Sequence, residues 1–317
     1  MKRILVTGAL GQIGSELVRK LRFEYGKDNV LATDIREDKN HDGPFEVLDV
    51  LDALKMYEVA KKFNADTMIH LAALLSATAE IKPILAWELN MGGLLNALEV
   101  SKELNMQLFN PSSIAVFGPT TPKINTPQET LQRPTTMYGV NKVAGELLCD
   151  YYHLRYGVDV RGLRFPGLIS PGTPPGGGTT DYAVEIYHKA VNEGSYTSYI
   201  AEGTYMDMMY MPDALNAIVD LMEADPAKLT VRNAYNVSAM SFDPSEIAAE
   251  IKKHIPHFEI KYDVDPVRQS IAESWPNSID SSRAIADWGF KARYDLEAMT
   301  IDMLDKIGGG ITSKTPL

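Results

Sequence analysis

A phenol and an ammonium lie four residues apart in the segment RPTTMYGVNKVAGELL, at Tyr138 and Lys142. Side chains at this spacing lie on one face of a helix, one turn apart. The pair has two interpretations. It is a surface contact, or it is a tyrosine whose pKa is tuned by the ammonium so that it takes up a proton.

A glycine-rich segment, TGALGQIGSEL, follows the first apolar run and places Gly8, Gly11 and Gly14 where a helix begins. Such glycines permit a tight turn, close approach of a pyrophosphate, and close packing of the helix on the strand. The first helical N–H groups, at Gln12 and Ile13, point toward a phosphate in this arrangement. We therefore predict nucleotide binding; the alternative is a purely structural turn.

Two aspartates follow the next two expected strands. Asp34 lies 20 residues after Gly14, where a carboxylate accepts both ribose hydroxyls of the adenosine and repels the extra phosphate of NADP. NAD is therefore the expected cofactor, although the neighbouring Arg36 argues against it. Asp49, with the Val50 backbone beside it, is in place to reach the adenine amino group. The alternative is that Asp49 caps a helix.

Short apolar runs alternate with helical patterns over the first half of the chain. We expect strands at 4–7, 29–34, 45–50, 67–73, 106–113 and 158–165, and helices at 15–26, 54–63, 84–104 and 143–157. Alternation of this kind predicts an α/β fold, a Rossmann-type doubly wound parallel sheet. Its strands are nearly all apolar because both faces of the sheet are buried.

The pattern becomes irregular after residue 169, where the chain is rich in Gly and Pro and then has short strands among helices. We divide the chain into an NAD-binding domain at 1–169, a smaller mixed α/β substrate-binding lobe covering most of 170–306, and a disordered tail at 307–317. The helical patterns at 212–224 and 295–306 are expected to pack back on the first domain.

Composition limits the kinds of partner. The net charge is −11, and Lys and Arg do not cluster as a nucleic-acid binder requires. No apolar run approaches the roughly 20 residues that span a membrane. The single cysteine, Cys149, lies in an apolar stretch and is read as a core residue of a cytoplasmic protein. His254 and His257 lack a matching carboxylate pattern, so no metal is expected.

Several motifs occur once each and in one order: the glycine motif, HLAA at 70–73, NMGG at 90–93, PSSIAVFG at 111–118 and YGVNK at 138–142. Together they resemble the extended short-chain dehydrogenases, which include nucleotide-sugar epimerases. The resemblance implies hydride transfer to or from a nicotinamide. It makes Tyr138 the base and Lys142 the group that lowers its pKa and holds the nicotinamide ribose. Ser113 orients the substrate oxygen.

The resemblance also implies further cofactor contacts and a dimer. The expected cofactor residues beyond those already named are Leu71, Ala72, Ala73, Asn90, Tyr138, Lys142 and Pro166. The helix LAWELNMGGLLNALEV and the helix bearing Tyr138 form a four-helix interface in relatives, so a homodimer is expected.

Segments of the second half are similar to family members that oxidise the β-hydroxyl of L-threonine to 2-amino-3-oxobutanoate, a step of threonine catabolism. The loop GGGTTDY offers a backbone N–H at Gly178 and hydroxyls at Thr179 and Thr180 to a carboxylate. The alternative is that Thr180 caps the next helix. Ser76 is expected to contact the amino or carboxylate group. Trp275 is either a lid or an aromatic residue at the lobe interface.

Two other functions stay open. A nucleotide-sugar 4-epimerase needs cations for a diphosphate, yet residues 170–210 contain Lys189 and no arginine, which leaves Arg232 and Arg268. A non-catalytic NAD-binding redox sensor does not need the tyrosine and lysine that this chain has. Dehydration is not expected, because Ile114 and Ala115 stand where sugar dehydratases carry acids.

Overall fold

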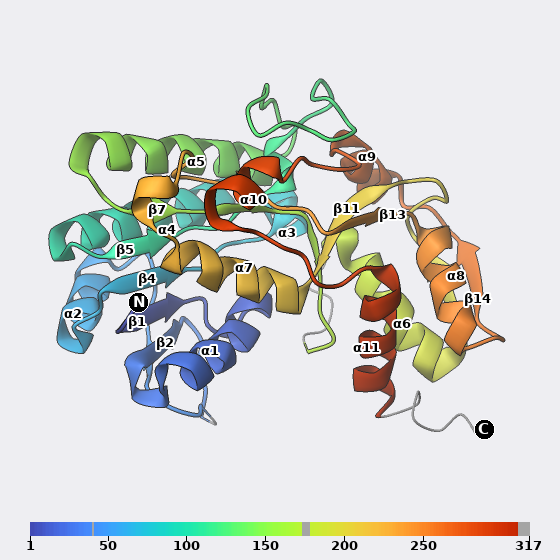
Figure 1. Ribbon diagram of the computed structural model, residues 1–317, viewed down its shortest axis with the longest axis horizontal. Helices are drawn as coiled ribbons and strands as arrows, with labels where there is room; N and C mark the ends of the chain where they lie inside the picture. The colour runs from blue at the N-terminus through green and yellow to red at the C-terminus, as the bar shows by residue number, and fades with distance from the viewer. Residues whose placement is uncertain (40, 173–177, 310–317) are drawn as a thin grey trace.

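The computed structural model describes residues 1–39, 41–172 and 178–309. Two lobes lie side by side, and the larger is built on a six-stranded sheet of order β3-β2-β1-β4-β5-β7 (Figure 1). Its strands are β1 (Ile4–Thr7), β2 (Val30–Asp34), β3 (Phe45–Val47), β4 (Thr67–His70), β5 (Gln107–Phe109) and β7 (Val160–Arg161). Every pairing in this sheet is parallel. The predicted Rossmann-type α/β fold is confirmed.

Helices cover both faces of this sheet. One layer contains α1 (Gln12–Tyr25) and α7 (Met211–Glu223), and the other contains α2 (Ala53–Phe63), α4 (Pro83–Leu104) and α5 (Met137–Tyr156). Ile4 and Val6 of β1 pack in the core with α1 and α7, whereas Leu5 packs in the core with α2, α4 and α5. Successive strand side chains point to opposite faces, so one short apolar strand serves two cores.

The helix that carries Tyr138 and Lys142 has clear signals at both ends. The Thr136 side chain accepts a hydrogen bond from the Gly139 N–H at 3.1 Å and so caps the first turn of α5. Gly157 ends the helix with φ of +73°, a conformation that glycine adopts at little cost. Both chemically active residues therefore lie within the first two turns of a helix with fixed ends.

Three small sheets are described beside the main sheet. The sheet of β6 (Ser112–Ser113), β8 (Leu163–Phe165) and β12 (Tyr235–Asn236) packs with the core of the first lobe. The second lobe contains a sheet of β9 (Gly167–Ile169), β11 (Met206–Tyr210) and β13 (Met240–Phe242), and a pair of β10 (Ser195–Ser198) with β14 (Glu259–Tyr262). Its helices are α6 (Tyr182–Glu193), α8 (Pro244–His254), α9 (Pro266–Ser274) and α11 (Leu296–Gly308). Two short helices, α3 (Ser76–Ile81) and α10 (Ser282–Trp288), complete the chain.

Two of the expected strands are each broken in the middle. The segment 106–113 divides into β5 and β6, and 158–165 divides into β7 and β8. Pro111 has no N–H to continue a ladder, and a Cβ on Gly162 would lie 2.5 Å from the Asn110 carbonyl oxygen. The two parallel segments therefore lie very close together at this point and keep the same register, and beyond it β8 pairs with β6 on one side and with β12 on the other.

Two helices of the second half were expected to pack on the first domain, and the structure places one on each lobe. The helix predicted at 212–224 corresponds to α7, whose apolar side chains share a core with α1 and β1, on the first lobe. The helix predicted at 295–306 corresponds to α11, but its residues Met299 and Met303 lie in the core of the second lobe with α6 and α8. Its apolar stripe is equally suited to either lobe, and the sequence does not distinguish them. Residues 310–317 of the expected tail lie outside the described residues.

A buried arginine fixes the end of α7 to the main sheet. Arg161 is 2 % exposed, and its Nη1 donates to the carbonyl oxygens of Leu221 at 2.6 Å, Met222 at 3.2 Å and Ala224 at 2.8 Å. Its Nη2 donates to Asp159 Oδ2 at 2.9 Å. The last carbonyls of α7, which have no partner within the helix, are thereby satisfied.

We predict that Arg161→Met lowers the free energy of unfolding by about 3–5 kcal/mol, because it removes a buried charged donor from the Asp159 carboxylate and from three carbonyl groups. Urea denaturation followed by circular dichroism measures this change. Lys189→Met, which removes an exposed ion pair with Glu193, is the control and has little effect. Equal effects of the two substitutions would contradict the prediction.

Candidate active site

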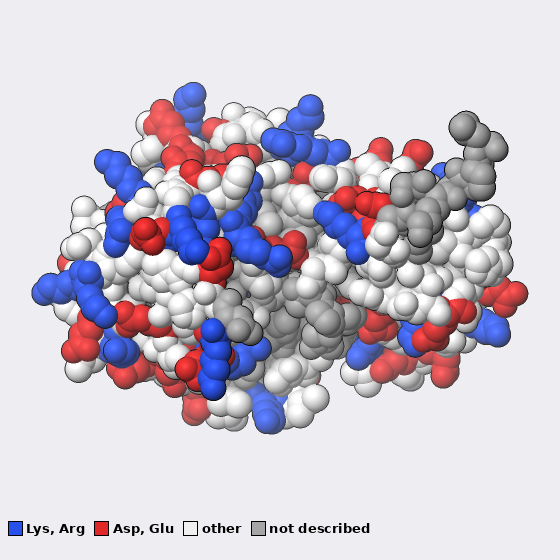
Figure 2. Space-filling model, turned by 90° about the horizontal axis from the view of Figure 1, so that it is seen from below, with Lys and Arg blue, Asp and Glu red and all other residues white. Residues whose placement is uncertain are grey.

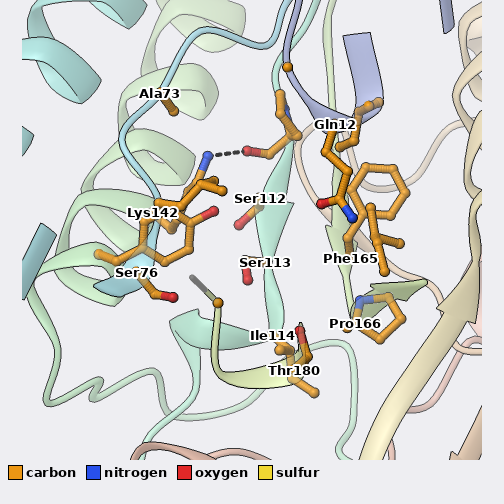
Figure 3. A pocket seen from close by; sticks show the side chains of 18 of the residues that line it. Gln12, Ala73, Ser76, Ser112, Ser113, Ile114, Lys142, Phe165, Pro166 and Thr180 are labelled. Atoms are coloured by element: carbon orange, nitrogen blue, oxygen red, sulfur yellow. Dashed lines mark hydrogen bonds between the residues drawn. The ribbon is translucent and has the colours of Figure 1, made fainter. Parts of the chain in front are cut away.

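A cavity opens between the lobes, at the carboxyl ends of the central strands (Figure 3). Lys142 and Ser76 lie on one side of it, Gln12, Phe165 and Pro166 lie on the other, and Ser112 and Ser113 lie between them. Most of the predicted site residues line it: Gly8, Gly11, Gln12, Ile13, Gly14, Leu71, Ala73, Ser76, Ser113, Tyr138, Lys142, Pro166, Gly178, Thr179, Thr180 and Trp275. One cavity therefore contains the predicted catalytic group, the glycine motif and the loop of the second lobe.

The predicted catalytic residues come from two neighbouring elements. Tyr138 and Lys142 lie on α5, and Ser113 ends β6 beside that helix. The Lys142 ammonium lies 5.4 Å from the centre of the Tyr138 ring, and it donates a 2.7 Å hydrogen bond to the Pro111 carbonyl oxygen. Pro111 is the residue at which β5 and β6 separate, so the broken strand itself anchors the lysine.

Burial dominates the pKa values of this group. It raises the pKa of Tyr138 to about 12, against a smaller lowering by a hydrogen bond with Ser113. It also lowers the pKa of Lys142 to about 8, against the opposing effects of Cys149 and Glu146. In the ligand-free protein, loss of water raises the pKa of Tyr138 more than the hydrogen bond with Ser113 lowers it, and the lowering expected from Lys142 stays a prediction.

The glycine motif forms a cradle that side chains would fill. Gly8 has a φ of +67°, and a Cβ there would lie 2.7 Å from the Ala72 nitrogen. A Cβ on Gly14 would lie 2.3 Å from the Gly8 carbonyl oxygen. No side chain caps α1, which begins immediately after Gly11, so its first N–H groups are left for a ligand. These features fit a nucleotide pyrophosphate.

The predicted adenosine residues lie at the ends of β2 and β3, outside the cavity lining. Asp34 is buried, and its carboxylate accepts hydrogen bonds from the Leu10 N–H at 3.0 Å and from the Arg36 N–H and Nε at 3.1 Å. Asp49 is exposed and accepts from the Leu51 N–H at 2.9 Å. The α2 helix is capped by Asp52 instead, so the capping alternative for Asp49 is wrong.

Two predicted cofactor residues, Ala72 and Asn90, line a small inner cavity next to the main one. The Asn90 amide is paired with the backbone of Leu74, at 2.8 Å to its N–H and 3.1 Å to its carbonyl oxygen. Its Nδ2 also donates to Asn141 Oδ1 at 3.1 Å. Asn90 thus holds the loop after β4 against α5, whereas Val50, the other predicted backbone contact, is buried in the core beneath α4.

The loop of the second lobe differs in detail from the expectation. The Gly178 N–H donates to Asp181 Oδ2 at 2.7 Å, so it is not free to hold a carboxylate. Thr180 lies inside the short turn Thr179–Asp181 and does not cap α6, whose N-cap is Asp181. The aspartate satisfies the start of this turn because its carboxylate is a stronger acceptor than a hydroxyl. Trp275 lines the cavity and belongs to the core of the second lobe.

Sequence reasoning missed several residues of the cavity wall. They are Leu75, Pro111, Ser112, Ile114, Phe165, Gly167, Leu168 and Asp181. All but Leu168 lie next to a predicted site residue or inside a recognised motif, so widening each prediction by one residue finds the others. Asp181 is the most informative omission, because it adds a carboxylate to the cavity wall.

Other kinds of site were sought across the described ranges 1–39, 41–172 and 178–309. No group of three His, Cys, Asp or Glu side chains there is arranged to hold a metal ion. In the same residues, no helix is long and apolar enough to cross a membrane. On the face drawn in Figure 2, basic and acidic side chains are interspersed and do not form a continuous basic field.

Comparison with known proteins agrees with this geometry. Residues 4–238 match the model of the NAD dependent epimerase/dehydratase family. An uncharacterised epimerase/dehydratase of Staphylococcus saprophyticus is 64% identical over 98% of both chains. The crystal structure of an L-threonine dehydrogenase from Clostridium difficile is 64% identical, covers 98% of both chains and superposes with a TM-score of 0.96. A monomeric L-threonine 3-dehydrogenase from a metagenome is 45% identical over 96% of this chain and 99% of its own, with a TM-score of 0.94.

The match to the family model covers the glycine cradle, β6 and the helix of Tyr138 and Lys142, and the similarity to solved dehydrogenases extends through the second lobe. These relatives imply a nicotinamide cofactor, which the cradle of Gly8 and Gly14 fits. The chain is therefore an enzyme that belongs to the NAD-dependent epimerase/dehydratase family.

Proposed function

We propose that this enzyme oxidises the β-hydroxyl of L-threonine to 2-amino-3-oxobutanoate with NAD. The observation that carries the proposal is the meeting of Ser113, Tyr138 and Lys142 with the glycine cradle in one cavity. Similarity to L-threonine dehydrogenases over nearly the whole chain, including the lobe that faces the catalytic helix, supports threonine as the substrate.

When bound and held by the glycine cradle and by Lys142, the oxidised nicotinamide would accept the hydride from the substrate carbon. Tyr138 takes the proton of the substrate hydroxyl, while Ser113 orients that oxygen. The Lys142 ammonium and the Ser113 hydroxyl stabilise the phenolate, and both act more strongly where burial removes water around them. Burial raises the pKa of Tyr138 to about 12 in the ligand-free protein, so the base needs these partners, and the positive charge of a bound nicotinamide would favour the phenolate further.

The charges of the cavity wall favour a small zwitterion. Among the described residues that line the cavity, Lys142 and Asp181 carry the only charges, while Ser76, Thr179 and Thr180 add hydroxyl groups. A nucleotide-sugar epimerase must hold a diphosphate, usually with arginine, and no arginine lines this cavity. Arg232, an earlier candidate for that role, is paired with Asp159 away from the cavity. We therefore favour an amino acid over a nucleotide sugar.

Asp34 supports NAD as the preferred form of the cofactor. Its carboxylate lies at the end of β2, beside the glycine cradle, where the ribose of the adenosine is expected. The Arg36 guanidinium is 63% exposed and already paired with Asp34 at 3.1 Å. It therefore neutralises the aspartate in part and does not by itself form a phosphate site.

A homodimer is supported by an apolar face on α4 and α5, which cover the same side of the sheet (Figure 1). The exposed apolar side chains on these helices are Ile84, Leu85, Trp87, Leu95, Val140, Leu147, Tyr151 and Leu154. Those on α5 recur at helical spacing and so form one stripe. We propose that a second copy of the chain covers this stripe.

The function is tested by NADH formation, followed at 340 nm, with L-threonine, D-threonine, L-serine and UDP-galactose. We expect L-threonine to be oxidised. Tyr138→Phe should lower kcat by about 10²–10⁴-fold, the usual contribution of a general base, while NAD binding remains. Loss of NAD binding would instead indicate misfolding. If no amino acid reacts and the UDP-sugar raises Tm, then L-threonine is not the substrate and a nucleotide sugar takes its place in the proposal.

The cofactor preference is tested with Asp34→Ala. The ratio of kcat/KM for NAD to kcat/KM for NADP should fall by about 10–100-fold, because charged hydrogen bonds to the ribose are lost and repulsion of the phosphate ends. Asp28→Ala removes an exposed carboxylate from the same lobe and should leave the ratio unchanged. Preference for NADP in the unaltered enzyme would contradict the assignment.

The oligomeric state is tested by sedimentation velocity at micromolar concentration. We expect a dimer that Leu147→Glu converts to a monomer, because the glutamate would be buried without a partner. Phe23→Glu makes the same kind of change at a 91 % exposed position on α1, on the other side of the sheet, and should leave the dimer intact. A monomeric unaltered protein, as described for the metagenome relative, would overturn the proposal.

A further inference from the structure

A buried ion pair lies directly behind the catalytic residues. Glu146 is 4 % exposed, and Arg164 of β8 donates to its two carboxylate oxygens, from Nε at 2.9 Å and from Nη2 at 2.8 Å. The Ser112 hydroxyl and the Gln132 side chain donate to the same carboxylate. Bidentate pairs of this kind are among the strongest and most directional contacts in proteins.

The carboxylate joins three elements of the site, α5, β6 and β8, through one side chain. Glu146 lies on α5, one turn after Lys142 and two turns after Tyr138. Ser112 precedes Ser113 on β6. Arg164 extends the network, since its Nη1 donates to the Gln128 carbonyl oxygen at 2.7 Å and to Asn236 Oδ1 at 3.1 Å. One side chain thus fixes the position of the catalytic helix along the strand that carries Ser113.

Glu146 also acts on the charge of Lys142. The groups that act on or contact this lysine are Tyr138, Glu146 and Cys149 on α5, His70 on β4 and the Pro111 carbonyl. Burial keeps His70 and Cys149 neutral, lowering the pKa of the histidine to about 3 and raising that of the thiol. Of these groups, Glu146 carries the negative charge that opposes the loss of the lysine proton.

We propose that Glu146 is a positioning residue of the catalytic group, holding Ser113 against Tyr138 and supplying the counter-charge that keeps Lys142 protonated. The reaction it serves is the one proposed above, but the role does not depend on which alcohol is oxidised. The competing interpretation is an ion pair that only stabilises the fold. An ion pair that serves only the fold is available for comparison: Arg161 of β7 pairs with Asp159 at the main sheet, away from the cavity.

Three variants separate these interpretations: Glu146→Gln, Arg164→Met and, as the control, Asp159→Asn. The measurements are the pH profile of kcat with L-threonine and the pH dependence of NADH affinity, read by fluorescence, which needs no substrate. We expect kcat and the affinity for NADH both to fall at alkaline pH, where Lys142 loses its proton. Glu146→Gln removes the negative charge near Lys142, so the lysine should lose its proton at lower pH. Arg164→Met removes the cation that shields that negative charge, so the lysine should lose its proton at higher pH.

We expect Glu146→Gln to move the alkaline limb of both profiles down by about one pH unit and Arg164→Met to move it up. Asp159→Asn should lower Tm without moving either limb. Glu146→Gln should also lower kcat by about 10-fold or more with little change in KM, because misplacement of the reacting groups affects the chemical step. Opposite shifts from the two partners of one ion pair are not produced by loss of stability alone.

Unmoved limbs in Glu146→Gln and Arg164→Met, or shifts in the same direction, would overturn the inference. If either single variant fails to fold, the double variant Glu146→Gln/Arg164→Met decides, because it leaves no buried charge unpaired. In the double variant, an alkaline limb at lower pH than in the unaltered enzyme supports the role of Glu146, and a limb at the same pH overturns it. Absence of threonine oxidation by the unaltered enzyme would refute the proposed function, while the NADH profiles would still test Glu146.

Discussion

The site depends on one close approach of the backbone, where the chain after β5 runs parallel to the chain after β7 in an unchanged register. A Cβ on Gly162 would lie 2.5 Å from the Asn110 carbonyl oxygen, so this approach requires glycine at that position. Beyond it, β6 and β8 separate from the main sheet and pair with each other and β12. This small sheet carries Ser113 into the cavity, brings Phe165 and Gly167 to its wall, and leaves the Pro111 carbonyl free to accept the Lys142 ammonium.

Burial determines the electrostatics of the site. It disfavours the charged forms of both Tyr138 and Lys142. A dry site is costly for these groups before the cofactor binds, yet it is the condition under which a charge acts strongly on its neighbour. The Glu146–Arg164 pair behind the lysine limits this cost, since it places a satisfied carboxylate near an ammonium that would otherwise lose its proton.

Local patterns in the sequence predicted the parts of the structure that depend on near neighbours. The strand Ile4–Thr7 was predicted to the residue, because alternation and glycine spacing are local signals. The helix expected at 143–157 was found, but it begins at Met137 and so includes Tyr138 and Lys142, as their spacing indicated. Features that depend on distant contacts were missed. The breaks at Pro111 and Gly162 lie where two distant chain segments approach closely, and α11 packs on the second lobe. Competition among acceptors explains why Asp181, and not a ligand, receives the Gly178 N–H.

The two lobes contribute different walls of the cavity, so the substrate and the hydride-transfer group can vary independently within one family. Ser113, Tyr138 and Lys142 are held by β6 and α5, next to the first lobe, and their roles require only an alcohol and a nicotinamide. The opposite wall comes from Thr179–Asp181 and from Trp275 of the second lobe. Replacing that wall changes the substrate without disturbing the hydride-transfer geometry, and a wall with one carboxylate and no arginine suits an amino acid better than a nucleotide sugar. The proposed oxidation involves no loss of water, and it needs no acid at Ile114 or Ala115 beside Ser113.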